Sequence, residues 1–210
     1  MPAPSRRDLL RWGLLIEGGL VLLALLGAWL FRVDLSCVRW TPAAVLWGLG
    51  GILPMLGVYR VSGELRDRVV ELLGPTLIRC RWYDLLLLAL LAGVGEELLF
   101  RGTIELALER YHLWGGMILA NLLFGLAHSL SWQYFVFATV IGVYLSWLSG
   151  FPGERNLLPA ILAHGLYDFA AFLLIRREVR VASSETTAEF SSLPVPPSAP
   201  APGEGADDGH

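Results

Sequence analysis

Charge is scarce in this chain of 210 residues, and that scarcity sets the class of protein. Only 17% of the residues are charged while 55% are hydrophobic, and the mean hydropathy is +0.57. A soluble domain usually carries about 25% charged residues, so the composition excludes an ordinary water-soluble domain. The net charge of −3 gives no indication of a nucleic-acid partner, and none is expected. The sequence instead predicts an all-α, polytopic membrane protein.

Cysteine is equally scarce, and the chain shows no internal repeat. The two cysteines, Cys37 and Cys80, fall on opposite sides of the membrane in the topology below. That separation excludes a disulfide within the chain, and neither cysteine has a metal-ligand partner nearby. No small-residue cleavage site follows the first apolar run, so we expect this helix to stay uncleaved. The lack of an inverted repeat and of paired broken helices argues against a small transporter.

Six apolar runs account for most of the chain. Inside lipid only helices or closed barrels satisfy their backbone hydrogen bonds, and these runs are too long and uniform for barrel strands. We therefore expect about six transmembrane helices, at residues 12–31, 42–59, 83–110, 113–130, 134–148 and 157–175. The segment 61–81 is short, charged and amphipathic, which predicts a helix on the membrane surface.

The chain divides into three predicted parts. Residues 1–82 hold the first two membrane helices and the interfacial segment, and residues 83–176 form a helical core that carries the motifs described below. From about Val181 the composition changes to serine, threonine, proline, alanine, glycine and acids. Such a segment cannot bury a core, so residues 181–210 are predicted to be a disordered C-terminal tail.

All sixteen basic residues are arginine, and their distribution predicts the orientation of the bundle. Eleven of them precede the first helix, lie between the second and third, or follow the sixth, and these fall on one side if six helices alternate. Because loops rich in basic residues stay in the cytoplasm, we expect a multi-pass cell-membrane protein with both termini cytoplasmic.

Charged residues interrupt the third run at GEELLFRG, residues 95–102. Each such charge costs roughly 2.5–3.5 kcal/mol near the centre of a membrane helix. Glu97 and Arg101 are four residues apart with the acid first, which is the favourable order for a helical ion pair. Glu96 is rotated by about 100° from Glu97. One glutamate is therefore predicted to be structural and the other to face a site; a purely structural charge network is the alternative.

Two further runs carry ionisable groups. In ANLLFGLAHSL the residues Asn121, Phe124 and His128 share one face, and in AILAHGLYDF the residues His164 and Asp168 lie one turn apart. A lone histidine often only bonds a backbone carbonyl, and a His–Asp pair often only clasps two helices. Ionisable groups at membrane depth on three helices, however, indicate a functional site.

These groups meet in one pocket if the third helix continues past Gly102 to about Arg110, because all then lie at similar depth at a rise of about 1.5 Å per residue. A carboxylate can take a proton from water, a neutral histidine can share that water or bind a metal, and a second histidine can donate to a developing oxyanion. No serine or cysteine stands in an evident nucleophile setting. The residue types therefore predict hydrolysis by activated water.

The three motifs, in this order and on separate apolar helices, resemble those of the CPBP family of intramembrane proteases. That family includes the type II CAAX prenyl endopeptidases and bacterial bacteriocin-processing or immunity proteins. The motifs read Glu96-Glu97-x-x-x-Arg101, Phe124-x-x-x-His128 and His164-x-x-x-Asp168. The resemblance covers residues 83–176 and implies an intramembrane endopeptidase.

Carried over by position, the resemblance implies Glu96 as general base and His128 as its partner in activating water. It places His164 and Asp168 at oxyanion-stabilising positions. The residues expected to support the site are Glu97, Arg101, Phe124 and Asn121.

Two features of this chemistry stay open. Eukaryotic prenyl proteases have asparagine where this chain has Asp168, and an ionised aspartate cannot donate a hydrogen bond to an oxyanion. Asp168 must then be protonated, orient His164, or join a metal site. The family is described both as metalloproteases and as glutamate proteases, and Zn²⁺ is the alternative cofactor. Its ligands would be Glu96, His128, His164 and Asp168. Because no H-E-x-x-H spacing is present, no obligatory metal is expected.

The expected partners are the lipid bilayer and a peptide or membrane-protein substrate. A non-catalytic membrane scaffold or immunity protein is the alternative function, and a small transporter is a weaker one. The sequence indicates neither the identity of the substrate nor an oligomeric state.

Overall fold

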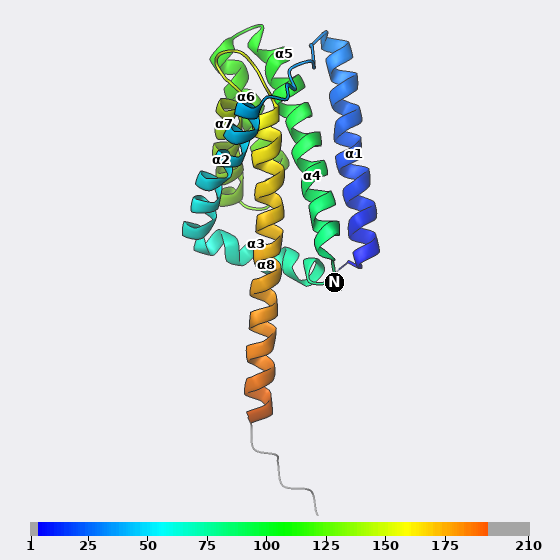
Figure 1. Ribbon diagram of the computed structural model, residues 1–210, viewed down its shortest axis with the longest axis vertical. Helices are drawn as coiled ribbons and strands as arrows, with labels where there is room; N and C mark the ends of the chain where they lie inside the picture. Colours follow the sequence, from blue (N-terminus) through cyan, green and yellow to red (C-terminus); the bar gives the residue numbers. More distant parts are fainter. Residues whose placement is uncertain (1–3, 193–210) are drawn as a thin grey trace, which may run out of the picture.

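A computed structural model describes residues 4–192, and every regular element in that range is helical. The longer helices pack side by side in a bundle, and α3 lies across the end at which the chain begins (Figure 1). In chain order the elements are α1 (Arg6–Phe31), α2 (Pro42–Val61), α3 (Gly63–Leu77), α4 (Trp82–Leu99), the π-helix η1 (Phe100–Glu105), α5 (Leu106–Glu109), α6 (Leu113–Ala127), α7 (Trp132–Leu148) and α8 (Leu158–Ser192). The prediction of an all-α membrane bundle is confirmed.

The six predicted membrane helices differ in how well they suit a bilayer. α1, α2 and the part of α8 up to Ala182 have both the length and the apolar composition to cross one. α6 and α7 are apolar but have 15 and 17 residues, against the roughly 20 needed to cross the hydrocarbon core. α4 holds Asp84, Glu96 and Glu97 among its 18 residues. The helices that carry the first two motifs are therefore the shorter or more polar ones.

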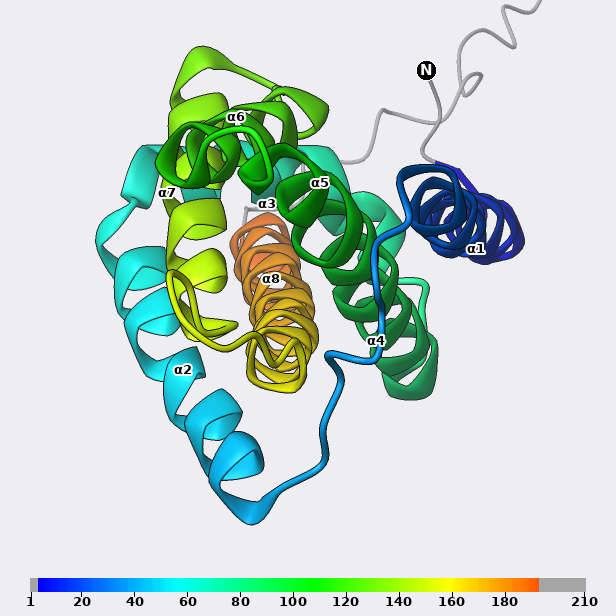
Figure 2. The ribbon, with the colours of Figure 1, turned by 90° about the horizontal axis from the view of Figure 1, so that it is seen from above.

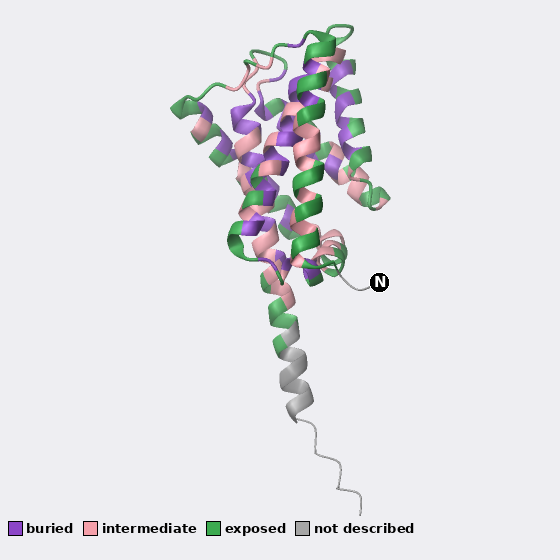
Figure 3. Ribbon diagram, turned by 90° about the vertical axis from the view of Figure 1, so that its right-hand side faces the viewer, coloured by how far each residue is buried: buried purple, intermediate pink, exposed green. Residues whose placement is uncertain are grey.

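α8 lies at the centre of the bundle, and α1 lies at its edge. Seen from above, α8 is surrounded by α2, α7, α6, α5 and α4, with α1 outside α4 (Figure 2). Half of the apolar window of α8 is buried, compared with 11% for α1. Exposed positions run along the outer faces of the helices (Figure 3), and Leu22 and Trp29 of α1 are 69% and 76% exposed. The central α8 is thus placed to contact residues from several other helices.

A pair of glycines sets the crossing of α4 and α8. A Cβ atom at Gly93 would lie 2.8 Å from the backbone nitrogen of Gly165, so only glycine lets the two backbones approach this closely. Small residues are the usual means of close helix packing in membranes. Glu97 comes one turn after Gly93, and His164 directly precedes Gly165. The crossing therefore brings these two side chains together.

The third apolar run is helical past Gly102, as predicted, but its geometry changes on the way. A π-helix covers Phe100–Glu105, between α4 and α5. The hydroxyl of Thr103 donates to the carbonyl oxygen of Leu98, five residues earlier, over 3.0 Å. Single π-turns of this kind are frequent at functional sites, and five of the six residues in this one are buried, including Arg101.

The turn between α6 and α7 differs from the prediction. α6 ends three residues earlier than predicted, because His128 forms its C-terminal cap, with Nδ1 2.9 Å from the carbonyl oxygen of Phe124. α7 begins two residues earlier, because the hydroxyl of Ser131 accepts a hydrogen bond from the backbone nitrogen of Tyr134 and caps the helix. His128 consequently lies at the end of α6, in the turn that connects α6 to α7.

α8 is longer than predicted. The sequence predicts a helix over 157–175 and a disordered tail from Val181, whereas the helix continues to Ser192. No proline or glycine occurs between residues 166 and 193, so no helix breaker ends it sooner. The predicted disorder of residues 193–210 lies outside the described residues.

Candidate active site

Glu97 is fully buried and connects two of the three motifs. Its Oε1 atom accepts a hydrogen bond from Nη1 of Arg101 over 2.9 Å, which is the predicted ion pair. The same oxygen lies 2.8 Å from Nδ1 of His164 on α8. A carboxylate at this position holds the proton on Nδ1 and fixes the orientation of the ring. The ion pair agrees with the sequence; the contact with His164 was not predicted.

Arg101 is completely buried, with 0% of its surface exposed. Besides Glu97, its guanidinium donates to Oδ1 of Asn121 over 3.2 Å. It also lies over the ring of Phe124, 4.1 Å from the ring centre, a cation–π contact that is strongest away from water. Asn121 and Phe124 therefore both contact Arg101, while Nε2 of His128, from the same motif as Phe124, faces Glu96.

Glu96 faces the other way, toward the two histidines. Its Oε2 atom lies 3.3 Å from Nε2 of His128 and 3.9 Å from Nε2 of His164. This oxygen is buried and has no hydrogen-bond partner within residues 4–192. Nδ1 of His128 is occupied by the carbonyl of Phe124 at 2.9 Å. A buried carboxylate oxygen and a ring nitrogen thus face each other at ion-pair distance without a regular hydrogen bond, so both can still bond a water molecule beside them.

Asp168 completes the group that the sequence singled out. Its Oδ2 atom lies 3.6 Å from Nε2 of His164, and its side chain is 23% exposed. The structure therefore brings together four candidates from α4, the end of α6 and α8, which we call the site cluster. Its members are Glu96, His128, His164 and Asp168.

The site cluster does not form a ready-made metal site. Within the described part of the chain, no group of three or more histidine, cysteine, aspartate or glutamate side chains is arranged to hold a metal ion. The Nδ1 atoms of His128 and His164 are taken by Phe124 and Glu97. Of the ring nitrogens, the Nε2 atoms are therefore the ones that face the site.

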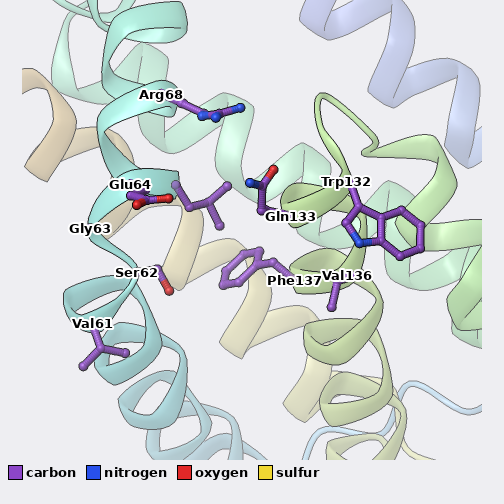
Figure 4. Close-up of a pocket in the computed structure, with 10 residues that line it drawn as sticks. Val61, Ser62, Gly63, Glu64, Arg68, Trp132, Gln133, Val136 and Phe137 are labelled. Carbon is purple, nitrogen blue, oxygen red and sulfur yellow. The ribbon is translucent and has the colours of Figure 1, made fainter.

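Asp168 also borders a cavity that leads away from the site cluster. This cavity of about 90 Å³ lies between α2, α3, α7 and α8, and Arg66, Tyr134 and Tyr167 are among its walls. A second cavity of about 530 Å³ opens between the start of α3 and α7 (Figure 4). A third, of about 560 Å³, separates α3 from the turn after α6. Leu65 of α3 lines all three, so α3 forms part of the wall of each cavity.

A second buried polar group, not predicted from the sequence, lies further along η1. The hydroxyl of Ser146 donates to Oε2 of Glu105 over 2.6 Å, and Nη2 of Arg155 donates to Oε1 of Glu105 over 2.6 Å. Arg155 also pairs with Glu109. We call these four residues the brace cluster. Nδ2 of Asn121 donates to Ser146 over 2.8 Å and so connects the brace cluster to Arg101.

Glu17 on α1 is a further acid that sequence reasoning missed. Like Glu96, it is a charged residue within an otherwise apolar run, and this feature could have identified it from the sequence. Its carboxylate lies within electrostatic range of all four members of the site cluster.

Comparison with known proteins agrees with the motifs. Residues 79–170 match the family described as type II CAAX prenyl endopeptidase Rce1-like. Neither the comparison with curated proteins nor the comparison with solved structures found a match. The matched range contains the three motifs and the whole site cluster. The helical core at residues 79–170 is therefore similar to a Rce1-like domain, and this similarity supports the resemblance to the CPBP family of intramembrane proteases.

Proposed function

We propose that this protein hydrolyses a peptide bond of a membrane-associated protein or peptide, with water activated by Glu96 and His128. The observation that supports this most directly is the unbonded approach of Glu96 Oε2 to His128 Nε2 at 3.3 Å. A water molecule beside this pair could bond to both atoms. The small cavity beside Asp168 lies on the α3 side of the site cluster, and we propose that the substrate approaches from that side.

The proposed reaction begins with proton transfer from this water to Glu96. The water oxygen forms a bond to the carbonyl carbon of the peptide, and the electron pair of the C=O double bond moves to its oxygen. Glu97 stabilises positive charge on the ring of His164, so a doubly protonated ring donates from Nε2 to the oxyanion. Asp168, 3.6 Å from that nitrogen, orients the ring. The proton on Glu96 then passes to the leaving nitrogen as the C–N bond breaks.

This reaction is proposed without an obligatory metal ion. The residues present offer only single histidine nitrogens and separated carboxylates to a metal. Elemental analysis of purified active protein tests the point. One stoichiometric Zn²⁺, with activity lost to a chelator and restored by zinc, would contradict it and make the site cluster the ligand set.

The cleavage itself is tested with purified full-length protein in detergent and a peptide library. The matched control is Glu96→Gln prepared in the same way. We expect fragments from the wild type that the variant does not produce. If neither protein cleaves any peptide, a scaffold or immunity role replaces the protease, and proton flux in liposomes would indicate a transporter instead.

We further propose that both termini, and with them α3 and the mouth of the cavities, lie in the cytoplasm. Eleven of the sixteen arginines lie on the side of the membrane that holds both termini. Loops rich in arginine stay in the cytoplasm, which supports this orientation. Reporter fusions after Arg39 and after Arg180 should report opposite sides, with the second cytoplasmic. The same side for both would contradict the topology.

A further inference from the structure

Glu17 is a charged residue that the proposed reaction does not use. It stands in the run LLIEGGLVLL, residues 14–23, within α1. An acid near the centre of a membrane helix costs about 2.5–3.5 kcal/mol on insertion scales and usually faces the interior of the bundle. The family match begins only at residue 79, so it assigns nothing to this helix.

The structure places Glu17 against the residue that precedes the proposed base. A Cβ atom at Gly95 would lie 2.9 Å from the backbone oxygen of Glu17, 3.5 Å from its Oε2 atom and 3.5 Å from Cβ of Leu20. α1 and α4 therefore touch at Gly95, and the absent side chain leaves the carboxyl group of Glu17 beside the backbone that carries Glu96.

Among the described residues, three carboxyl oxygens in this region have no hydrogen-bond partner: the Oε2 atoms of Glu17, Glu96 and Glu97. Glu97 already bonds Arg101 and His164 through its other oxygen, so Glu17 and Glu96 are the two considered next. Oε2 of Glu17 and Oε2 of Glu96 are both shielded from solvent, and neither has a hydrogen-bond partner among the residues that the structure describes. Buried polar atoms are almost always bonded to protein, water or ligand. The Glu17 carboxyl group lies against α4 at Gly95, next to the residue that carries the Glu96 carboxylate. Glu17 thus faces the helix that carries the proposed base.

We propose that Glu17 is a positioning residue of the hydrolytic site: its carboxyl group carries a proton and donates it to Glu96 through a bridging water. Two carboxylates held close together away from bulk water do not both keep a full negative charge. A proton on Glu17 satisfies both unpartnered oxygens and leaves the charge on Glu96, which needs it to accept a proton from the attacking water. This role rests on the proposed hydrolytic function and acts through Glu96, without contact to the substrate.

The test compares three variants of the full-length protein by steady-state kinetics. Glu17→Leu keeps the helix apolar and removes the donor, so kcat should fall by up to about 10²-fold with KM little changed. Glu17→Gln supplies an amide donor in the same place and should retain most of the wild-type kcat. Leu20→Ala loosens the same contact with α4 without changing charge and should leave kcat unchanged. Wild-type kcat in Glu17→Leu, equal losses in Glu17→Leu and Glu17→Gln, or the same loss in Leu20→Ala would each overturn the proposal.

A second readout does not depend on activity. The infrared spectrum of the wild type should show the carbonyl band of a protonated carboxyl group that disappears in Glu17→Gln and shifts in Glu96→Gln. If the wild type cleaves no peptide, the proposed function fails, and this band alone decides whether Glu17 donates to Glu96. Absence of the band in the wild type would overturn the inference even in an active protease.

Discussion

The two polar clusters inside the bundle are held together in different ways. In the brace cluster, Glu105 accepts hydrogen bonds from Ser146 and Arg155, each over 2.6 Å. In the site cluster, the closest approach to Glu96 is 3.3 Å, and Asp168 stays 3.6 Å from His164. Since charges in a membrane interior are costly unless they are paired, the brace cluster is what a structural network should look like. The site cluster holds its charged groups in longer ion pairs of 3.3–3.9 Å, so they can also bond a water molecule and a reacting group.

The clusters are linked, and Glu97 stands at the link. Arg101 joins Glu97 to Asn121, and Asn121 continues to Ser146. On its other side, Glu97 fixes His164. The network that runs from Glu97 through Arg101 and Asn121 to Ser146 therefore holds the ring of His164 in place.

The largest expected effect is a loss of activity on changing Glu96 in the site cluster. Glu96→Gln keeps the shape of the side chain and removes a buried charge, so the melting temperature should stay the same or rise. Hydrolysis should fall by roughly 10²–10⁴-fold, as expected for a lost general base. Melting temperature and cleavage rate are measured on the same preparation.

Glu97→Gln is the matched comparison for this change. It leaves the buried Arg101 without its carboxylate, which typically costs about 3–5 kcal/mol, and it frees His164. The melting temperature should therefore fall together with the activity. A Glu96→Gln protein that still cleaves peptide would assign the base to another group.

The next largest effect is a loss of stability on changing Arg155 in the brace cluster. Arg155→Ala leaves Glu105 and Glu109 facing each other without a cation, so the free energy of unfolding should fall by about 3–5 kcal/mol. The rate per folded molecule should change little, because Arg155 does not contact the site cluster. Unfolding in detergent, followed by circular dichroism, measures the difference.

The control for this prediction lies in the neighbouring loop. Arg39 pairs with Glu154, and their side chains are 48% and 79% exposed, so Arg39→Ala should lower stability by less than about 1 kcal/mol. Equal losses in Arg39→Ala and Arg155→Ala would show that burial does not distinguish the two ion pairs.

Local spacing was enough to predict part of this arrangement. The ion pair of Glu97 and Arg101 follows from a separation of four residues on one helix. The proximity of Glu96 to His128 and His164 follows from their similar depths on three apolar helices. The helical core and its apolar runs likewise follow from composition, because lipid leaves the backbone few alternatives.

Long-range contacts were not predictable in the same way. Ser146 and Glu105 are 41 positions apart, and a serine in an apolar run looks the same whether it bonds its own helix or another. The π-helix at Phe100–Glu105 depends on how η1 packs against α1 and α6 rather than on a recognisable sequence pattern. Glu17 is recognisable in the sequence as a lone acid in an apolar helix. The side to which it faces depends on the contact of α1 with Gly95 of α4, which residue spacing within α1 does not predict.

The smallest expected effect tests whether the two clusters depend on each other. Ser146→Ala removes the hydroxyl that donates to Glu105 and accepts from Asn121. Two buried polar groups then lose one partner each, so the free energy of unfolding should fall by about 1–3 kcal/mol, less than for Arg155→Ala. Ser129→Ala is the control: its hydroxyl is exposed and bonds only the nearby carbonyl of Leu126, so its effect should stay within about 0.5 kcal/mol. Asn121 keeps its bonds to Met117 and Arg101 in the Ser146 variant, and the cleavage rate per folded molecule should stay near the wild-type value. A rate that falls as far as in Glu97→Gln would mean that the site depends on the whole network and not on Glu97 and Arg101 alone.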